Sequence, residues 1–403
     1  MPKTTLPAFR NRLWDFGFSG MALAVVVVQV ALHLPPITGI HQYFCVYHAG
    51  VDSAWHGNSP YHIGPIQNTV ERRLKIQPGG FSCGFFLPPT SFVILAPFAT
   101  VSWQIADRAW ILLSISCAVI CGSLAHSFGR TLSNRPGWGF VAATILLCPL
   151  VQRAIALGQT PLFICACIAL AQRAFECGRP RLGTLLWASV AIKPHLALPL
   201  LAAAWFIGGW RRGMGIAVTM SIAWIAGCFL IGDPVSVSLG YVDFLGDSHK
   251  AIGFNRIEND QIVGWNRLLA SVGGPLIEFG SIGVLAGFSI SLGVLWALRI
   301  RRLESPNSQW ILAASVAWGL FTAQAHGYEL VMLALTAPYL LRLKDQRCHV
   351  DLAVLLGVLL VMSVPREAVV RLMLATDVTA AILSYRAAAL AVFCVHLLIR
   401  KPQ

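Results

Sequence analysis

The fold is decided by apolar runs such as residues 183–207, GTLLWASVAIKPHLALPLLAAAWFI, in which Lys193 is the only Asp, Glu, Lys or Arg. A helix needs about 20 mainly apolar residues to cross a bilayer. Similar runs recur along the 403 residues, of which 56% are hydrophobic and 12% charged. Soluble chains are about 25% charged, so this composition excludes a soluble enzyme and a disordered chain. The runs lack the alternation of a β-barrel, and we therefore predict an all-α polytopic membrane protein.

About twelve transmembrane helices are expected. The candidate spans are 17–35, 107–128, 137–157, 161–176, 182–193, 195–209, 213–231, 279–300, 309–325, 328–343, 348–364 and 376–399. Pro194 cannot donate a backbone hydrogen bond and disfavours helix at the residue before it, so we expect a break at Lys193. The apolar stretch 89–104 is short and contains Pro97, which indicates a re-entrant or interfacial helix.

The basic residues predict the orientation. They form short clusters between the apolar runs, and the net charge is +13. Cytoplasmic loops of membrane proteins carry such clusters, so both termini are expected in the cytoplasm. Counting 89–104 as a full span, with 182–209 as one helix, would move the clusters 130–135 and 173–181 outside. The preferred topology leaves two long outer segments, 36–106 and 233–278, within a single membrane domain, 1–403. This distribution of charge gives no support to a nucleic-acid partner.

Several kinds of chemistry lack their usual sequence signals. The chain has no G-x-x-x-x-G-K-[ST] phosphate loop, no H-E-x-x-H zinc helix and no G-x-S-x-G elbow. The histidines on the expected outer side lack the spacing of metal ligands, so we expect neither a metal nor a cofactor. Unusual polar groups instead gather at the expected outer ends of helices. They include Gln159, Lys193, His195 and His326.

The order of the outer motifs resembles glycosyltransferase family 87, a group of polytopic GT-C enzymes that includes polyprenyl-phosphate-mannose-dependent mannosyltransferases. The matching motifs are Phe44-Cys-Val-Tyr-His-Ala-Gly50, Trp55-His-Gly57, Pro60-Tyr61, Phe85-Phe86-Leu-Pro-Pro89, Leu95-Ala-Pro97, Leu157-Gly-Gln159, Ala191-Ile-Lys-Pro194, Asp260-Gln261-Ile-Val-Gly264-Trp-Asn-Arg267 and His326. They follow the family order from about residue 40 to 345. Each motif is weak alone, and the ordered set carries the resemblance.

The resemblance implies a GT-C-like fold and the transfer of a hexose, with mannose expected, from a polyprenyl-phosphate sugar. The acceptor would be a lipid or glycan, the reaction inverting, and the site would face outward from the inner or plasma membrane. The family's catalytic aspartate position is occupied here by Gln42, or by Tyr43 with a one-residue shift, and glutamine cannot hold a proton at neutral pH. The neighbouring His41, which is slightly preferred, and the nearby Asp52 are therefore the expected candidates for the base. A carboxylate from Glu258 or Asp260 in the second outer segment is a further alternative. The expected substrate-binding residues are Gln42, Tyr47, Gln159, Lys193, His195, Asn266, Arg267 and His326.

Three other functions stay open at this point. Twelve spans and broken helices also fit a transporter or flippase, although the two halves show no internal symmetry. A lipid-linked glycan ligase or polymerase would share the outward site. The replacement at Gln42 also permits an inactive or repurposed relative of the family.

Overall fold

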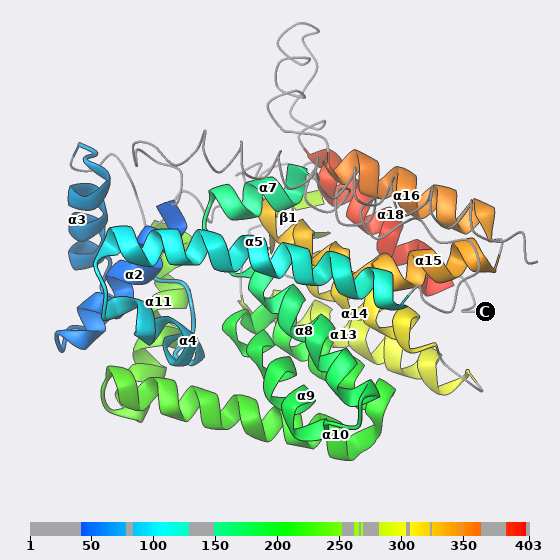
Figure 1. The fold of residues 1–403 in the computed structure, drawn as a ribbon, viewed down its shortest axis with the longest axis horizontal. Coiled ribbons are helices and arrows are strands. Elements are labelled where there is room, and N and C mark those ends of the chain that lie inside the picture. The colour runs from blue at the N-terminus through cyan, green and yellow to red at the C-terminus, as the bar shows by residue number, and fades with distance from the viewer. Residues whose placement is uncertain are drawn as a thin grey trace, which may run out of the picture.

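The described chain folds almost entirely into helices, as the computed structural model in Figure 1 shows. The structure describes residues 42–77, 84–128, 149–251, 262–265, 267–268, 282–303, 307–322, 325–346, 348–363 and 384–399. The α-helices are α2 (Gln42–Trp55), α3 (Ile63–Leu74), α4 (Thr90–Ala99), α5 (Trp103–Phe128), α7 (Pro149–Ala156), α8 (Pro161–Glu176), α9 (Pro180–Trp187), α10 (Pro194–Ile231), α11 (Pro234–Ala251), α13 (Ile282–Arg301), α14 (Ser308–Thr322), α15 (Ala337–Asp345), α16 (His349–Ser363) and α18 (Tyr385–Ile399). The other elements are the 3₁₀-helices η2 (Ala188–Ile192) and η5 (Gly327–Thr336) and the strands β1 (Ile262–Val263) and β2 (Ala325–His326).

Two described helices are long and apolar enough to cross a membrane by themselves. These crossings cover Trp103–Leu124 in α5 and Pro194–Ile231 in α10. A third is formed if α7 and α8, which are bent by 117° relative to one another, count as one broken span. The chain is thus a helical membrane protein. The number of twelve spans stays a prediction, since 17–35 and most of 137–157 lie outside the described residues.

The helical structure is interrupted just before Pro194, as proline chemistry predicts. The helix η2 ends at Ile192, Lys193 has φ −122° and ψ 90°, and α10 begins at Pro194. A second break lies at Gly209, where φ 78° and ψ 174° interrupt α10 between the candidate spans 195–209 and 213–231. Glycine adopts this positive φ without the steric cost of a Cβ atom.

The segment 328–343 differs from the single α-helical span that we expected. It starts as η5 and becomes α-helical only at Ala337. A 3₁₀-helix has three residues per turn, so side chains at i and i+3 lie on one edge. This winding places Glu329 and Met332 on the same edge, and both are buried.

Aromatic packing fixes α2 against α4, α5 and the turn between α7 and α8. The Phe44 ring stacks on Trp110 with centroids 4.8 Å apart, and it also meets Phe98 edge-on. Gly158 in the turn has φ 67°, and a Cβ atom there would lie 2.7 Å from Phe44 Cβ. The Gly158 carbonyl accepts a hydrogen bond from Trp110 Nε1 at 3.1 Å. The turn that precedes Gln159 is therefore held directly against α2.

The second expected outer segment, 233–278, meets the chain before η5 through a pair of strands. The antiparallel strands β1 and β2 pair Ile262 with His326 and Val263 with Ala325. Nothing in the sequence pattern predicted this pairing, because each strand has only two residues.

Candidate active site

The centre of the candidate site is the Glu329 carboxylate, which is buried in η5. Its Oε1 atom lies 2.6 Å from Lys193 Nζ, and its Oε2 atom lies 3.3 Å from His195 Nε2. The backbone N–H of His326 also donates to Oε2, at 3.0 Å. Burying an unpaired carboxylate would be very costly, and hydrogen bonds from the Lys193 ammonium and the His326 N–H, with the His195 ring close by, offset that cost here. We call these four residues the Glu329 cluster.

Local backbone structure explains how Lys193 and His195 reach the cluster. Lys193 is the N-cap residue of α10, and His195 lies in the first turn of that helix. Pro194 is favoured at the first helical position because no intrahelical bond needs its missing N–H. Helix N-termini carry partial positive charge, so the start of α10 also stabilises the nearby carboxylate.

Three tyrosines surround the cluster. The His326 and Tyr328 rings stack with centroids 5.4 Å apart and an interplanar angle of 10°. Lys193 Nζ lies 5.5 Å from the Tyr328 centroid, within the range of a cation–π contact. Tyr43 of α2 approaches Tyr328 at 5.7 Å, and Tyr47 lies one helical turn further along α2. The α2 helix thus forms one wall of the site.

Gln159 joins this wall through its side chain. Tyr47 donates its hydroxyl hydrogen to Gln159 Oε1 at 2.7 Å. The Nε2 amide of Gln159 is buried and has no hydrogen-bond partner among the described residues. Buried amide donors are normally satisfied, so an unsatisfied one beside an ionic cluster is a good candidate for contact with a ligand.

The imidazole of His326 is neutral at physiological pH. Burial lowers its pKa to about 4, with smaller lowering effects from Lys193 and His195 and an opposing effect from Glu329. A neutral imidazole retains a nitrogen lone pair that can accept a proton. The site therefore combines a fixed cation, a buried carboxylate and a neutral proton acceptor.

The structure brings several predicted site residues together and separates others. Lys193, His195 and His326 meet at Glu329, while Tyr47 and Gln159 pair beside them. Arg267 is buried on the segment that follows β1. Gln42 is the first residue of α2. His41 and Asn266 lie outside the described residues.

Glu329 is the site residue that sequence reasoning missed. It is the only carboxylate in the candidate span 328–343. An ionisable residue inside an apolar span is a functional candidate by default, so this signal was available. Its partner could not be identified from the sequence, because Lys193 is 136 positions away.

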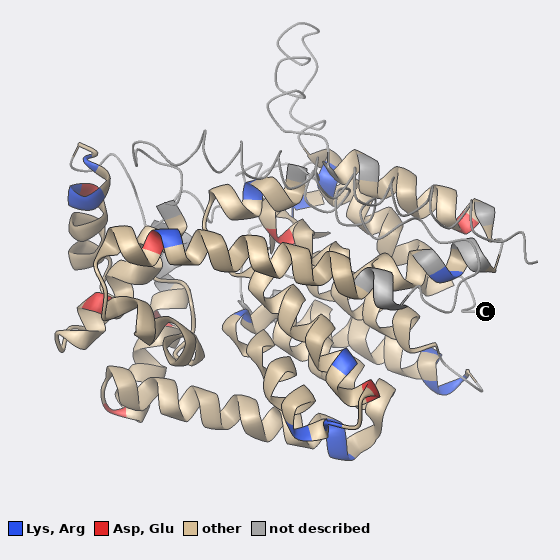
Figure 2. Cartoon of the chain, viewed as in Figure 1, with Lys and Arg blue, Asp and Glu red and all other residues tan. Residues whose placement is uncertain are grey.

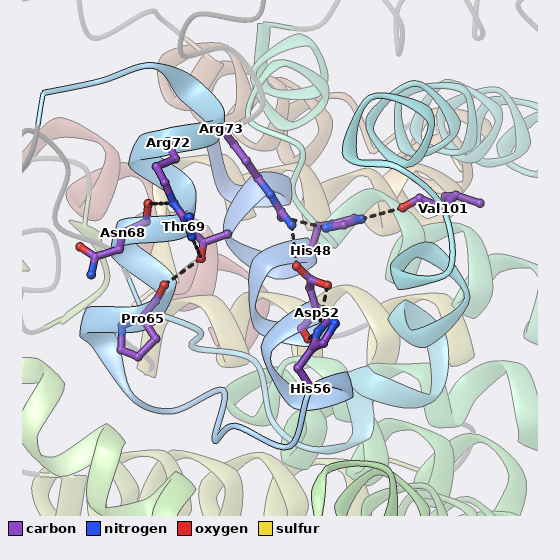
Figure 3. A network of polar contacts seen from close by, with 9 residues as sticks. All are labelled: His48, Asp52, His56, Pro65, Asn68, Thr69, Arg72, Arg73 and Val101. Atoms are coloured by element: carbon purple, nitrogen blue, oxygen red, sulfur yellow. Dashed lines mark hydrogen bonds and ion pairs between the residues drawn. The ribbon is translucent and has the colours of Figure 1, made fainter.

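Asp52 belongs to a second polar cluster, between α2 and α3. Figure 3 shows its carboxylate facing Arg73, with Oδ2 and Nη2 2.7 Å apart. The next guanidinium nitrogen of Arg73 lies 2.9 Å from His48 Nδ1. Arginine can only donate, so Nδ1 accepts and the N–H at Nε2 faces the Val101 carbonyl, 3.4 Å away. These contacts connect α2, α3 and the turn before α5.

The His48 contacts predict a loss of stability in acid. Burial, followed by the neighbouring Arg73, lowers the pKa of His48 below its usual value. The folded state thus favours neutral His48, and this stabilisation is complete above about pH 6.5 and declines as the pH falls below it. Between pH 7 and 5.5 we expect the Tm of the wild type to fall more than that of His48→Gln, in which the amide replaces the neutral imidazole. Equal Tm slopes for the two proteins would contradict this role.

The fold and the Glu329 cluster define a helical membrane protein with a buried ionic site. Comparison with protein families matches residues 85–333 to glycosyltransferase family 87. The match covers more than half of the chain, which therefore belongs to glycosyltransferase family 87 and is a membrane glycosyltransferase. The matched residues include Gln159, Lys193, His326 and Glu329, whereas the α2 motif lies before them. No curated protein and no solved structure matches the chain.

Proposed function

We propose that this protein transfers a hexose, with mannose as the expected sugar, from a polyprenyl-phosphate sugar to a lipid or glycan acceptor. The observation that carries the proposal is the Glu329 cluster, in which a lysine ammonium is fixed at a helix end of a family 87 protein. A phosphate leaving group at a membrane interface needs at least one fixed cation.

In the proposed reaction the acceptor oxygen attacks the anomeric carbon and forms the new glycosidic bond with inversion. The bond from that carbon to the phosphate oxygen breaks, and the phosphate leaves with the electron pair. Lys193 has three N–H donors, and the ion pair with Glu329 leaves the others for phosphate oxygens. Arg267 is the second proposed phosphate ligand because a guanidinium can bind two oxygens. The buried Nε2 amide of Gln159 would bind a sugar or phosphate oxygen.

The acceptor hydroxyl must lose a proton to a base, and we propose His326 for this role. It is neutral and lies within the Glu329 cluster. Glu329 is a weaker candidate because its two oxygens already accept hydrogen bonds from the Lys193 ammonium and the His326 N–H. His41 and Asp52 are the alternatives that the sequence suggested, and the Asp52 carboxylate is paired with Arg73.

The proposed location is the inner or plasma membrane, with both termini in the cytoplasm and the site facing outward. The start of α10, which carries Lys193, would then lie on the outer side. Figure 2 shows Lys and Arg at the ends of α9, α13 and α15 and at the turn within α10, which the proposed topology places on the cytoplasmic side, and also on α3, α5 and α7, which it places toward the outer side. We propose that residues 1–403 form one membrane domain of about twelve helices, which works without a metal or cofactor.

A transfer assay with single variants tests the function and the base together. Purified protein is incubated with radiolabelled polyprenyl-phosphate mannose and membrane lipids, and transferred label is counted. We expect His326→Ala to lower turnover by about 10²- to 10⁴-fold, the usual contribution of a general base. Asp52→Asn and His41→Ala should each lower it less than ten-fold.

The outcomes of this assay separate the alternatives. Full activity of His326→Ala with loss of activity in Asp52→Asn would assign the base to Asp52 instead. Absence of transfer to any lipid or glycan acceptor, together with movement of the labelled donor across the bilayer, would indicate a flippase and overturn the proposal. Each variant must retain the wild-type Tm for its loss of rate to be interpreted as chemistry.

A further inference from the structure

A cluster of arginines lies at the ends of α8 and α9 and at the turn within α10. We call it the arginine patch, and its members are Arg173, Arg179, Arg181, Arg211 and Arg212. All are exposed except Arg212, which is partly buried. The carboxylate within these segments is Glu176, which pairs with Arg173 at 3.3 Å. Figure 2 shows the end of α8, the start of α9 and the turn within α10 close together. The patch therefore carries a clear excess of positive charge.

Contacts through Phe175 confirm that the three segments meet. The guanidinium carbon of Arg212 lies 3.9 Å from the centre of the Phe175 ring. The same ring covers Gly183 of α9 so closely that a Cβ atom there would lie 2.7 Å from it. Phe175 is thus packed between α9 and the turn in α10. The turn itself is fixed by the positive φ of Gly209.

The second half of α10 indicates how deep the patch lies in the bilayer. Its exposed face carries an apolar stripe at helical spacing, formed by Val218, Ile222, Ile225 and Phe229. Such a stripe on a membrane-spanning helix faces hydrocarbon. A helix from Arg212 to Ile231 rises about 28 Å, close to the hydrocarbon thickness of about 30 Å. The arginines at one end of this helix therefore lie at the level of the lipid headgroups.

Tryptophans at the same level support this depth. Trp205 and Trp210 flank the turn in α10, and both side chains are exposed. Tryptophan is enriched at the boundary between hydrocarbon and headgroups. The Arg211 guanidinium lies 5.7 Å from the Trp210 ring, which places cationic and interfacial side chains together.

We propose that the arginine patch binds the headgroup phosphate of anionic phospholipids in the leaflet around it. Guanidinium groups bind phosphate through two parallel hydrogen bonds, and basic residues beside a transmembrane helix attract anionic lipid. This site is separate from the Glu329 cluster and does not depend on the sugar donor. In the proposed topology the leaflet is the cytoplasmic one.

A lipid-binding experiment on the purified full chain tests the proposal. Protein in phosphatidylcholine nanodiscs is titrated with fluorescent phosphatidylglycerol, and the apparent Kd is measured. The variant Arg179→Gln/Arg181→Gln is compared with Arg72→Gln/Lys75→Gln, which removes the same charge from exposed positions in the last turn and at the C-cap of α3. At about five-fold per arginine, we expect binding to the first variant to weaken roughly 10- to 30-fold and binding to the second to change less than two-fold.

Three results would overturn the proposal. The first is equal weakening in both variants, which would indicate a response to net charge alone. The second is equal affinity for labelled phosphatidylcholine and phosphatidylglycerol. The third is displacement of the lipid by millimolar inorganic phosphate, which would assign the patch to a soluble anion. Sugar transfer in phosphatidylcholine should be unchanged in Arg179→Gln/Arg181→Gln, so this test is independent of the transfer assay.

Discussion

Replacing Lys193 by methionine is expected to lower the rate of sugar transfer by about 30- to 1,000-fold. It should also lower the free energy of unfolding by about 3–5 kcal/mol, because Glu329 would remain buried without its closest cation. Methionine keeps most of the volume and the apolar stem of lysine, so the change removes charge more than packing. The rate is measured with labelled donor, and stability is measured by unfolding in detergent.

A second substitution separates stability from catalysis in this pair. Glu329→Gln retains an oxygen that can accept the His326 N–H, and it removes the charge that Lys193 balances. The double variant Lys193→Met/Glu329→Gln should lose less unfolding free energy than the sum of the losses in the two single variants. The difference, the coupling energy, should be about 0.5–3 kcal/mol. The double variant should nevertheless stay inactive, because the phosphate has lost its cation.

The control for this pair is Arg173→Met, which breaks the exposed ion pair with Glu176. Both of those side chains are about half exposed, and exposed pairs contribute about 1 kcal/mol or less. Loss of 3 kcal/mol in the control, or full transfer activity in Lys193→Met, would contradict the role given to the buried pair.

Replacing Gly158 by alanine is expected to destabilise the protein by about 2–5 kcal/mol. Two effects contribute to this figure. The positive φ costs alanine about 1–2 kcal/mol, and overpacking against Phe44 costs about 1–3 kcal/mol more. The nearest atoms are the Cβ and backbone of Phe44, which cannot rotate away as a long side chain could. Because Gly158 precedes Gln159, transfer activity should fall as well.

Gly178→Ala provides the matched control. Gly178 also has a positive φ, 70°, but no atom of the described residues lies within 4 Å of the added Cβ position. Its cost should therefore be limited to about 1–2 kcal/mol of backbone strain. If the two variants unfolded with the same free energy, close packing of the turn on α2 would not be the cause.

The parts of the fold that depend on local chemistry could be predicted from the sequence. The interval 161–176 was expected as a helix and is α8, which begins at Pro161 and ends just before Cys177 and Gly178. Proline at a first helical position and glycine after the last turn are strong local signals. The break at Lys193 followed from Pro194 for the same reason.

The parts that depend on distant partners could not be predicted. Hydropathy predicted 328–343 as one α-helix, since most side chains there are apolar and a period of 3.0 residues resembles one of 3.6. The pairing of β1 with β2 involves residues 64 positions apart in sequence, as between Ile262 and His326. The partners of Glu329 could not be predicted, because Lys193 and His195 are supplied by another element. Family resemblance identified Lys193 and His326 but gave no information on the carboxylate between them.

The separation of Lys193 and Glu329 in sequence has a consequence for biosynthesis. The ribosome completes Lys193 136 residues before Glu329. At about 5–20 residues per second, the lysine exists for roughly 7 to 27 seconds before its carboxylate partner is made. During that interval the start of α10 is already being inserted, and its ammonium must be solvated by water, lipid phosphate or the insertion machinery. The ion pair between Lys193 and Glu329 therefore forms late, once η5 has been inserted.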